Sequence, residues 1–230
     1  MTTQEVIKAL RALGTEHHRN QFARFGIVAS EAFGVKSPDI QKLAKQIGKN
    51  HELAVQLFEE PHHEAKLITA FLAEPKLLTK ELMDHWASQV YSWDLCDNLC
   101  MHLFRRSPLA EEVAYQWVMD DREFVRRCGL VLMTSLSIHN KKASNEWLLK
   151  YIEAATPYVT DERNFVKKAV SWLLRSQGKR NLTLRTTILE KCDQIATKHP
   201  TSKSVIWIIS DVRRELMKKE VLERLERKEG

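Results

Sequence analysis

Apolar positions recur three and four residues apart along most of the chain, and strand-like alternation is scarce. Residues 1–14 (MTTQEVIKALRALG) and 36–48 (KSPDIQKLAKQIG) show the helical pattern clearly. In the second segment Ser37 is predicted as the N-cap, Pro38 lies in the first turn and Gly48 follows the helix end. Only 7 Gly and 6 Pro occur, too few for a turn-rich β fold. The sequence therefore predicts an all-α protein.

Helix boundaries recur along the rest of the chain. Turn and helix-start residues lie at Pro61, Pro75, Ser107–Pro108, Asp120–Asp121, Asn140, Thr160–Asp161, Gly178 and Pro200. This spacing predicts roughly a dozen short helices. No Ser/Gly-rich linker or low-complexity segment separates them, so residues 1–230 are expected to form a single domain. Residues 213–230 are expected to form a charged helix with a solvated face.

One internal repeat is recognisable. Residues 122–133 (REFVRRCGLVLM) and 163–174 (RNFVKKAVSWLL) share Arg, Phe, Val and a basic pair 41 positions apart. A helical period near 40 is typical of HEAT and armadillo proteins, whose antiparallel helix pairs stack into a curved α-solenoid. The basic residues Arg126, Arg127, Lys167 and Lys168 are expected to emerge on one face of consecutive repeats and to contact a phosphate backbone. The alternative is that they form ion pairs between repeats.

The charge is unevenly distributed. The formal net charge is +6; residues 1–100 hold 11 Lys/Arg and 13 Asp/Glu, whereas residues 101–230 hold 25 and 17. A basic C-terminal half favours a polyanionic partner such as nucleic acid, although long helices also carry Lys and Arg for solubility.

Several other classes of protein lack support. There is no apolar run of about 18 residues and no signal-peptide pattern, so no membrane or secretory destination is expected. The motifs GxxxxGK[ST], GxGxxG and GxSxG are missing, which leaves nucleotide-binding and serine-hydrolase functions without support. The four cysteines, Cys96, Cys100, Cys128 and Cys192, lack the spacing of a secreted scaffold, which favours reduced thiols in a cytoplasmic protein. We therefore expect no disulfides.

No metal site is expected either. Cys96 and Cys100 with His102 lack a fourth closely grouped ligand, so apolar packing is the favoured interpretation for these cysteines. The pairs His17–His18 and His62–His63 place adjacent rings on different helix faces and lack the HExxH spacing.

Residues 91–100 (YSWDLCDNLC) combine an aromatic residue with two carboxylates. Trp93 and Asp97 are four residues apart, so on a helix they point the same way. Asp94 lies one position after Trp93 and faces elsewhere. We expect it to pair with a neighbouring basic side chain or to cap the helix. The pattern places a carboxylate beside an indole on one helix face.

Taken in order, SWDLCD (92–97), FVRRCG (124–129) and FVKKAVSWLLR (165–175) resemble the AlkD family of alkylpurine DNA glycosylases, which are built from HEAT-like repeats. The stretch ARFGIVASEAFGVKSPDIQKLAK (23–45) is similar to that family's N-terminal helices, so the resemblance covers nearly the whole chain. It implies a C-shaped solenoid with a basic concave face that binds double-stranded DNA. Family positions in the cleft match Trp93, Asp97, Arg127 and Trp172, and Phe25 stands where the family typically has Tyr.

The resemblance implies hydrolysis of the N-glycosidic bond of alkylated purines such as 3-methyladenine and 7-methylguanine in base excision repair, by a monomer without cofactor. Alkylation makes the base cationic and therefore a good leaving group. Asp97 would stabilise the developing positive charge and orient water, while Trp93 and Trp172 would hold the cation by cation–π attraction. Arg127 would grip a flanking phosphate.

Two other functions stay open. One is a non-catalytic HEAT-repeat protein that binds bent or branched DNA, and the other is a protein-binding HEAT scaffold. An acid in a positive groove favours the enzyme, because a scaffold does not need Asp97. The lost hydroxyl at Phe25 counts mildly against it, and Trp172 is a core residue if its family match is set aside.

Overall fold

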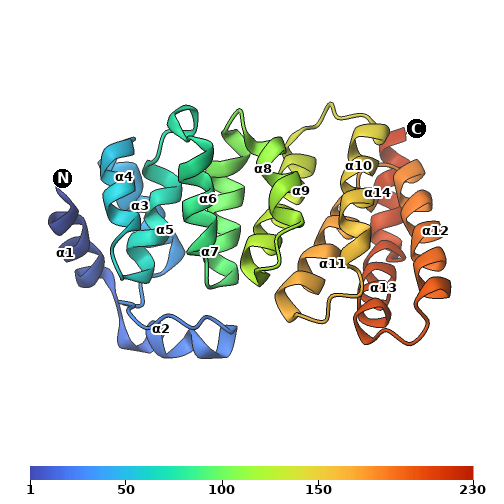
Figure 1. Cartoon of the computed structure of the whole chain (residues 1–230), viewed down its shortest axis with the longest axis horizontal. Coiled ribbons are helices and arrows are strands. Elements are labelled where there is room, and N and C mark those ends of the chain that lie inside the picture. The colour runs from blue at the N-terminus through green and yellow to red at the C-terminus, as the bar shows by residue number, and fades with distance from the viewer. Residues whose placement is uncertain (230) are drawn as a thin grey trace. The chain divides into compact units, whose positions relative to one another are not determined.

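A computed structural model describes residues 1–229. All regular elements in that range are helical: they are helices α1–α14 and short 3₁₀ or π segments η1–η5, with no strand (Figure 1). The all-α prediction is thus confirmed for the described chain. The residues group into two compact units, Met1–Val113 and a second that begins at Ala114. Each unit is described by itself, and the single domain expected over 1–230 stays a prediction.

The first unit contains α1–α7 and the first residues of α8. Its elements are α1 (Thr3–Leu13), α2 (Glu16–Gln21), η1 (Ala23–Phe25), α3 (Ser37–Ile47), α4 (His51–Phe58), α5 (His63–Leu72), η2 (Pro75–Leu77), α6 (Lys80–Ser88), α7 (Trp93–Asn98), η3 (Leu99–Leu103), η4 (Phe104–Arg106) and α8 (Ala110–Val118). Asn50 and Thr79 cap α4 and α6 by accepting hydrogen bonds from backbone N–H groups. Helix α3 ends at Gly48 (φ 78°) as predicted, but Lys36 occupies the N-cap position expected for Ser37.

Helix α5 is the centre of the first unit. It packs against α1, α3, α4, α7 and η3. Nearly all its side chains are buried, including the polar His63, Glu64, Lys66 and Thr69. Burial of such groups is costly unless they are hydrogen-bonded. Each of the four has a hydrogen-bond partner, so polar contacts as well as apolar packing organise this unit.

The second unit repeats a pair of helices. After α8 come α9 (Glu123–His139), α10 (Asn145–Ala155), η5 (Thr156–Tyr158), α11 (Asn164–Gly178), α12 (Leu182–Lys198), α13 (Lys203–Leu216) and α14 (Lys219–Glu229). Helix α11 lies between α9 and α13, and α10 and α12 pack alongside them in a second layer (Figure 1). A Cβ on Gly129 would lie 2.4 Å from the backbone N of Val118, so glycine permits the close approach of α9 to α8.

This layering of successive helix pairs is that of a HEAT-like α-solenoid, so the predicted fold class is confirmed; the C-shape and the basic concave face stay predictions. All four cysteines are buried, and burial raises the pKa of the Cys192 thiol to about 11. None of the described helices is both long and apolar enough to span a membrane.

Candidate nucleic-acid interface

Helix α7 carries two of the predicted site residues. Trp93 is its first residue and Asp97 lies one turn later, so the two side chains share a face, as expected. Both are half-buried and hence partly accessible. The π-helical segment η3 follows α7 directly, and such segments are frequent at functional sites.

Trp93 and Phe25 are brought together although they lie far apart in the sequence. The indole Nε1 of Trp93 donates a hydrogen bond of 2.8 Å to the backbone carbonyl of Phe25. The Phe25 ring is 52% exposed at the end of η1. The bond involves the main chain, so a hydroxyl on the residue 25 ring is not needed to hold the indole in place.

A buried histidine lies behind α7. The Nδ1 atom of His63 is 2.7 Å from the Tyr91 hydroxyl, and its Nε2 atom is 2.8 Å from Oδ2 of Asp94. Burial raises the pKa of Tyr91, so its hydroxyl keeps its proton. Burial alone would raise the pKa of Asp94, but the hydrogen bond from His63 outweighs it and holds the pKa below its usual value. The partners therefore assign Tyr91 O–H as donor to Nδ1, and Nε2–H as donor to the Asp94 carboxylate.

The start of α5 thus contacts both α7 and the segment that leads to Phe25. The ring of Phe22 meets His63 edge-on at 5.5 Å, which ties the segment before Phe25 to α5. Glu64 accepts hydrogen bonds from three consecutive backbone N–H groups, those of Phe33 (3.0 Å), Gly34 (2.7 Å) and Val35 (3.1 Å). Asp94 pairs with the imidazole of His63, as expected for a partner with a basic side chain. These contacts of His63 and Glu64 were not predictable from local sequence patterns, because their partners are about thirty residues away along the chain.

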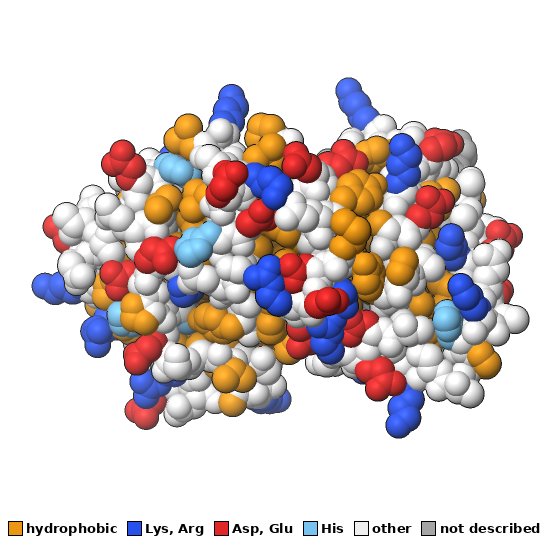
Figure 2. Space-filling model, viewed as in Figure 1, with side chains coloured by type: hydrophobic (Ala, Val, Ile, Leu, Met, Phe, Trp, Pro, Cys, Tyr) orange, Lys and Arg blue, Asp and Glu red, His pale blue; other side chains and the backbone are white. Residues whose placement is uncertain are grey.

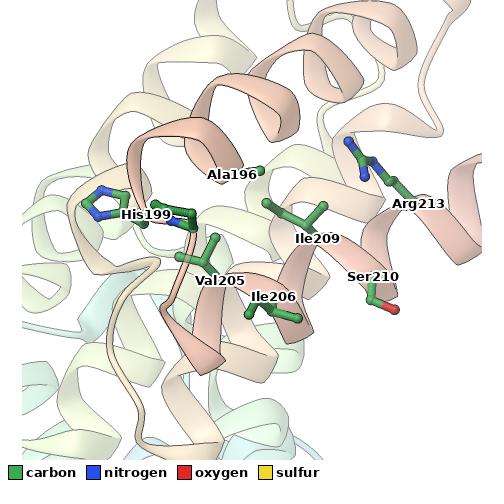
Figure 3. Close-up of a pocket in the computed structure, with 8 residues that line it drawn as sticks. Ala196, His199, Val205, Ile206, Ile209, Ser210 and Arg213 are labelled. Atoms are coloured by element: carbon green, nitrogen blue, oxygen red, sulfur yellow. The ribbon is translucent and has the colours of Figure 1, made fainter.

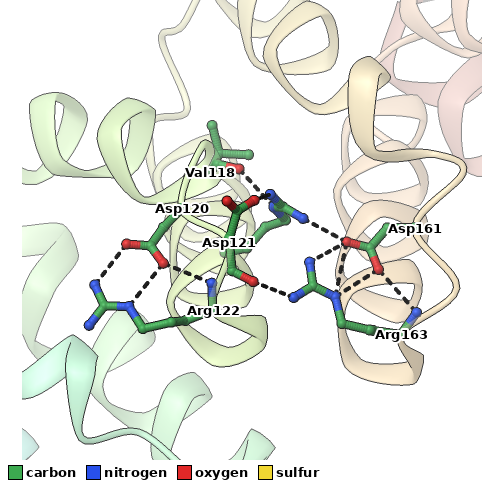
Figure 4. Close-up of polar contacts among 7 residues, drawn as sticks. Val118, Asp120, Asp121, Arg122, Asp161 and Arg163 are labelled. Carbon is green, nitrogen blue, oxygen red and sulfur yellow. Dashed lines mark hydrogen bonds and ion pairs between the residues drawn. The ribbon is translucent and has the colours of Figure 1, made fainter.

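In the second unit the repeat extends further than the sequence comparison indicated. Oδ1 of Asp120 accepts hydrogen bonds from the backbone N (2.8 Å) and Nε (3.0 Å) of Arg122. Oδ1 of Asp161 accepts the same pair from Arg163, at 3.0 and 2.9 Å. The turn before α9 is therefore repeated before α11 (Figure 4). The sequence signal was an Asp-x-Arg pattern, in which the Arg is the first residue of each aligned segment and the Asp lies two residues before it.

Arg126 joins these repeats. Its Nη1 is 2.8 Å from Asp161, Nη2 is 3.0 Å from Asp121, and Nε donates to the carbonyl of Val118 at 3.2 Å. The guanidinium also lies 4.3 Å from the ring centroid of Tyr158. Burial would raise the pKa of Asp161, but hydrogen bonds from its arginine partners lower it to about 2. The alternative of ion pairs between repeats is thus confirmed for Arg126.

The expectation that both arginines emerge beside the lysines is wrong. Arg126 and Arg127 are buried, at 8% and 5% exposure. Nη1 of Arg127 donates to the carbonyl of Phe165 at 2.9 Å, because the side chain turns toward the next repeat. Lys167 is half-buried with Nζ 5.5 Å from the Trp207 ring centroid, and Lys168 is exposed. Contact of these residues with DNA stays a prediction, for which Lys168 is the most accessible member.

Trp172 lies on α11 and is half-buried rather than fully packed in the core. It lines a hollow with basic side chains from three segments of the second unit. Another hollow, of about 430 Å³, lies between α12 and α13, and Val205, Ile206 and Ile209 line it (Figure 3). Its apolar lining does not suit a phosphate backbone. On the face shown in Figure 2, basic and acidic side chains are interspersed and form no uniform basic surface.

Comparisons with known proteins agree on one relationship. The family model of the DNA alkylation repair enzymes matches residues 6–206. A solved structure described as a new family of proteins related to the HEAT-like repeat DNA glycosylases, with affinity for branched DNA structures, has a TM-score of 0.76 and 22% sequence identity. That similarity covers 85% of this chain and 83% of the other, and at this identity it establishes the fold. No curated protein matches the sequence.

Proposed function

Because the chain belongs to the family of DNA alkylation repair enzymes, we propose that it is a glycosylase that hydrolyses the N-glycosidic bond of alkylated, cationic purines in duplex DNA. The observation that carries the proposal is the partly accessible face of α7, where Trp93 and Asp97 lie one turn apart. A carboxylate and an indole face can both stabilise the positive charge that develops on the sugar in the transition state.

In the proposed reaction the bond between the sugar and the cationic base breaks first, and its electron pair leaves with the base, which becomes neutral. The positive charge then lies on the sugar. The carboxylate of Asp97 stabilises this charge and orients a water molecule, whose oxygen bonds to the sugar carbon as its proton is lost. Trp93 presents its indole to the same charge, and the hydrogen bond to the Phe25 carbonyl fixes the orientation of the ring.

The basic residues supply affinity for the backbone. Exposed Lys168 is suited to a phosphate contact, since a Lys that neutralises a phosphate releases a counterion condensed on the DNA. Arg127 is held by the Phe165 carbonyl, and its proposed phosphate contact rests on the family resemblance. Trp172 is assigned by the same resemblance to the aromatic residues around the damaged nucleotide.

A second candidate function is binding of branched DNA without catalysis. The related solved structure is described as having this affinity. On this chain Phe25 lacks a hydroxyl and Arg127 is buried, and both features weaken the match to a catalytic family member.

One experiment separates the two functions. The purified protein is incubated with methylated duplex DNA, released bases are quantified by chromatography, and binding to a four-way junction and to plain duplex is measured in parallel. The glycosylase proposal predicts release of 7-methylguanine or 3-methyladenine above the spontaneous rate. Tight junction binding without base release would support the second function.

A further inference from the structure

A basic hollow of about 560 Å³ lies beside the C-terminal half of α11. Its walls come from three segments of the second unit: Trp172 and Ser176 on α11 with Lys179, Arg180 and Asn181 after it, Ile138, Lys141 and Ala143 at and after the end of α9, and Arg224 and Lys228 on α14. The volume falls within the range of about 300 to 1,000 Å³ typical of small-ligand sites. The hollow is therefore large enough for an organic ligand.

The hollow has an uncompensated positive charge. No Asp or Glu is among the described residues that line it, whereas Lys and Arg supply five of the ten. Lys179 pairs with Glu215 at 3.0 Å, but Lys141 and Lys228 are exposed and take part in no ion pair of the described chain. Concentrated charge of one sign at a concave surface attracts an anion.

Part of this charge is fixed in position. Arg180 donates to the carbonyls of Ser137 (3.3 Å), Asn140 (2.9 Å) and Lys141 (3.2 Å), which orient its guanidinium without neutralising it. Arg224 and Lys228 are four residues apart on α14 and share a face. Asn181 caps α12 by accepting a 2.8 Å hydrogen bond from the Leu184 N–H, so the positive end of that helix dipole lies at the same hollow.

The hollow also contains an aromatic surface. Trp172 is half-buried and lies one turn before Ser176, so both residues face the hollow from α11. A ring next to several cations matches a ligand that has both a flat π system and phosphate groups. Base stacking on aromatic side chains beside a basic groove is the usual way in which proteins bind unpaired nucleic acid.

From these features we infer that the hollow binds a nucleotide of an unpaired DNA strand, with its base stacked on Trp172 and the flanking phosphates held by Lys141, Arg224 and Lys228. The inference rests on the proposed function in taking the polyanion to be DNA, and it shares Trp172 with that function. It adds a site for unpaired nucleotides to a protein proposed to act on duplex DNA.

The test measures binding of a fluorescein-labelled oligothymidylate to the full chain by anisotropy. Trp172→Ala should weaken affinity about tenfold, as expected for one lost base stack, and Trp172→Phe should restore most of it. Lys141→Ala should make the salt dependence shallower by about 0.7 in logarithmic slope, as for one lost phosphate contact on a single strand. Lys142→Ala is the matched control, because Lys142 is exposed next to Lys141 and does not line the hollow.

The inference is overturned if Lys141→Ala and Lys142→Ala behave alike, or if Trp172→Ala binds the oligothymidylate as wild type does. Thymidine monophosphate separates a strand from a free nucleotide as the ligand: equal affinity for both would overturn the strand assignment. Urea denaturation of each variant checks that the fold is intact. Base release from methylated duplex by Lys141→Ala is a separate readout, because Lys141 has no role in the proposed reaction, so loss of strand binding by this variant does not imply loss of base release.

Discussion

The Nε2 atom of His63 lies 2.8 Å from Oδ2 of Asp94, and the two residues come from different helices of the first unit. His63 is buried and Asp94 is half-buried, and the pair joins the centre of that unit to α7, the helix of Trp93 and Asp97. The hydrogen bond thus ties α7 to the centre of the unit, while Trp93 and Asp97 stay partly accessible.

Replacing Asp94 should therefore change stability. Asp94→Ala leaves Nε2–H of His63 buried without its acceptor, and we expect unfolding to become easier by about 2 kcal/mol in urea denaturation. Asp94→Asn keeps an acceptor oxygen and should lose less than half of that. Equal stability of wild type and Asp94→Ala would show that the pair does not hold α7.

The ion pairs that Asp161 makes with Arg163 and Arg126 should appear in the pH dependence of stability. The pKa of Asp161 is lowered to about 2 in the folded protein, so its contribution is complete above the unfolded pKa near 4 and is lost as the pH falls through 2. Asp161→Asn should lower the free energy of unfolding by about 2 kcal/mol at neutral pH. The difference from wild type should shrink steadily between about pH 4 and pH 2. A difference independent of pH would contradict the assignment.

Substitutions at positions 126 and 168 should have different effects: the first should lower stability and the second should weaken DNA binding. Lys168→Ala should reduce the logarithmic salt slope of duplex binding by about 0.9 without loss of stability, because the side chain is exposed. Arg126→Ala should lower stability by about 3 kcal/mol, since it leaves the buried carboxylate of Asp161 without one of its partners. Exposed Lys150 on α10 supplies the matched control, and Lys150→Ala should change neither property.

The helices and their repeat followed from the sequence because apolar spacing and capping are local. Gly48 ended its helix as predicted, and the 41-residue repeat located α9 and α11. The exposure of Arg126 did not follow, because the acid that holds it, Asp161, is 35 residues away and belongs to the next repeat. Local spacing shows which residues share a helix face but does not show whether a neighbouring helix covers that face.

The candidate site also has one feature that was predictable from the sequence and one that was not. Trp93 and Asp97 share a helix, so their common face was predictable from a spacing of four. The contact between Trp93 and the Phe25 carbonyl spans 68 positions and involves the main chain, for which a sequence pattern gives no signal.

Loss of the hydrogen bond from Trp93 to the Phe25 carbonyl should affect activity more than stability. Trp93→Phe keeps a ring but removes the N–H donor, so the aromatic face is held less firmly. We expect base release to fall about tenfold, or about 1.4 kcal/mol in barrier, in single-turnover assays on methylated duplex. Phe25→Tyr preserves the backbone carbonyl and serves as the control, with release at or above the wild-type rate. Unchanged release by Trp93→Phe would exclude the indole from the reaction.

The most direct test of the proposed function is release of 7-methylguanine and 3-methyladenine by wild type, Asp97→Asn and Asp39→Asn proteins, with Asp39 as a carboxylate on α3 of the same unit that is half-buried like Asp97. Asp97→Asn removes one charge at constant size, so release should fall at least about tenfold, while duplex binding persists or tightens because a negative charge facing phosphates is gone. Asp39→Asn should match wild type. No base release by wild type, or equal release by the Asp97 variant, would contradict the catalytic account.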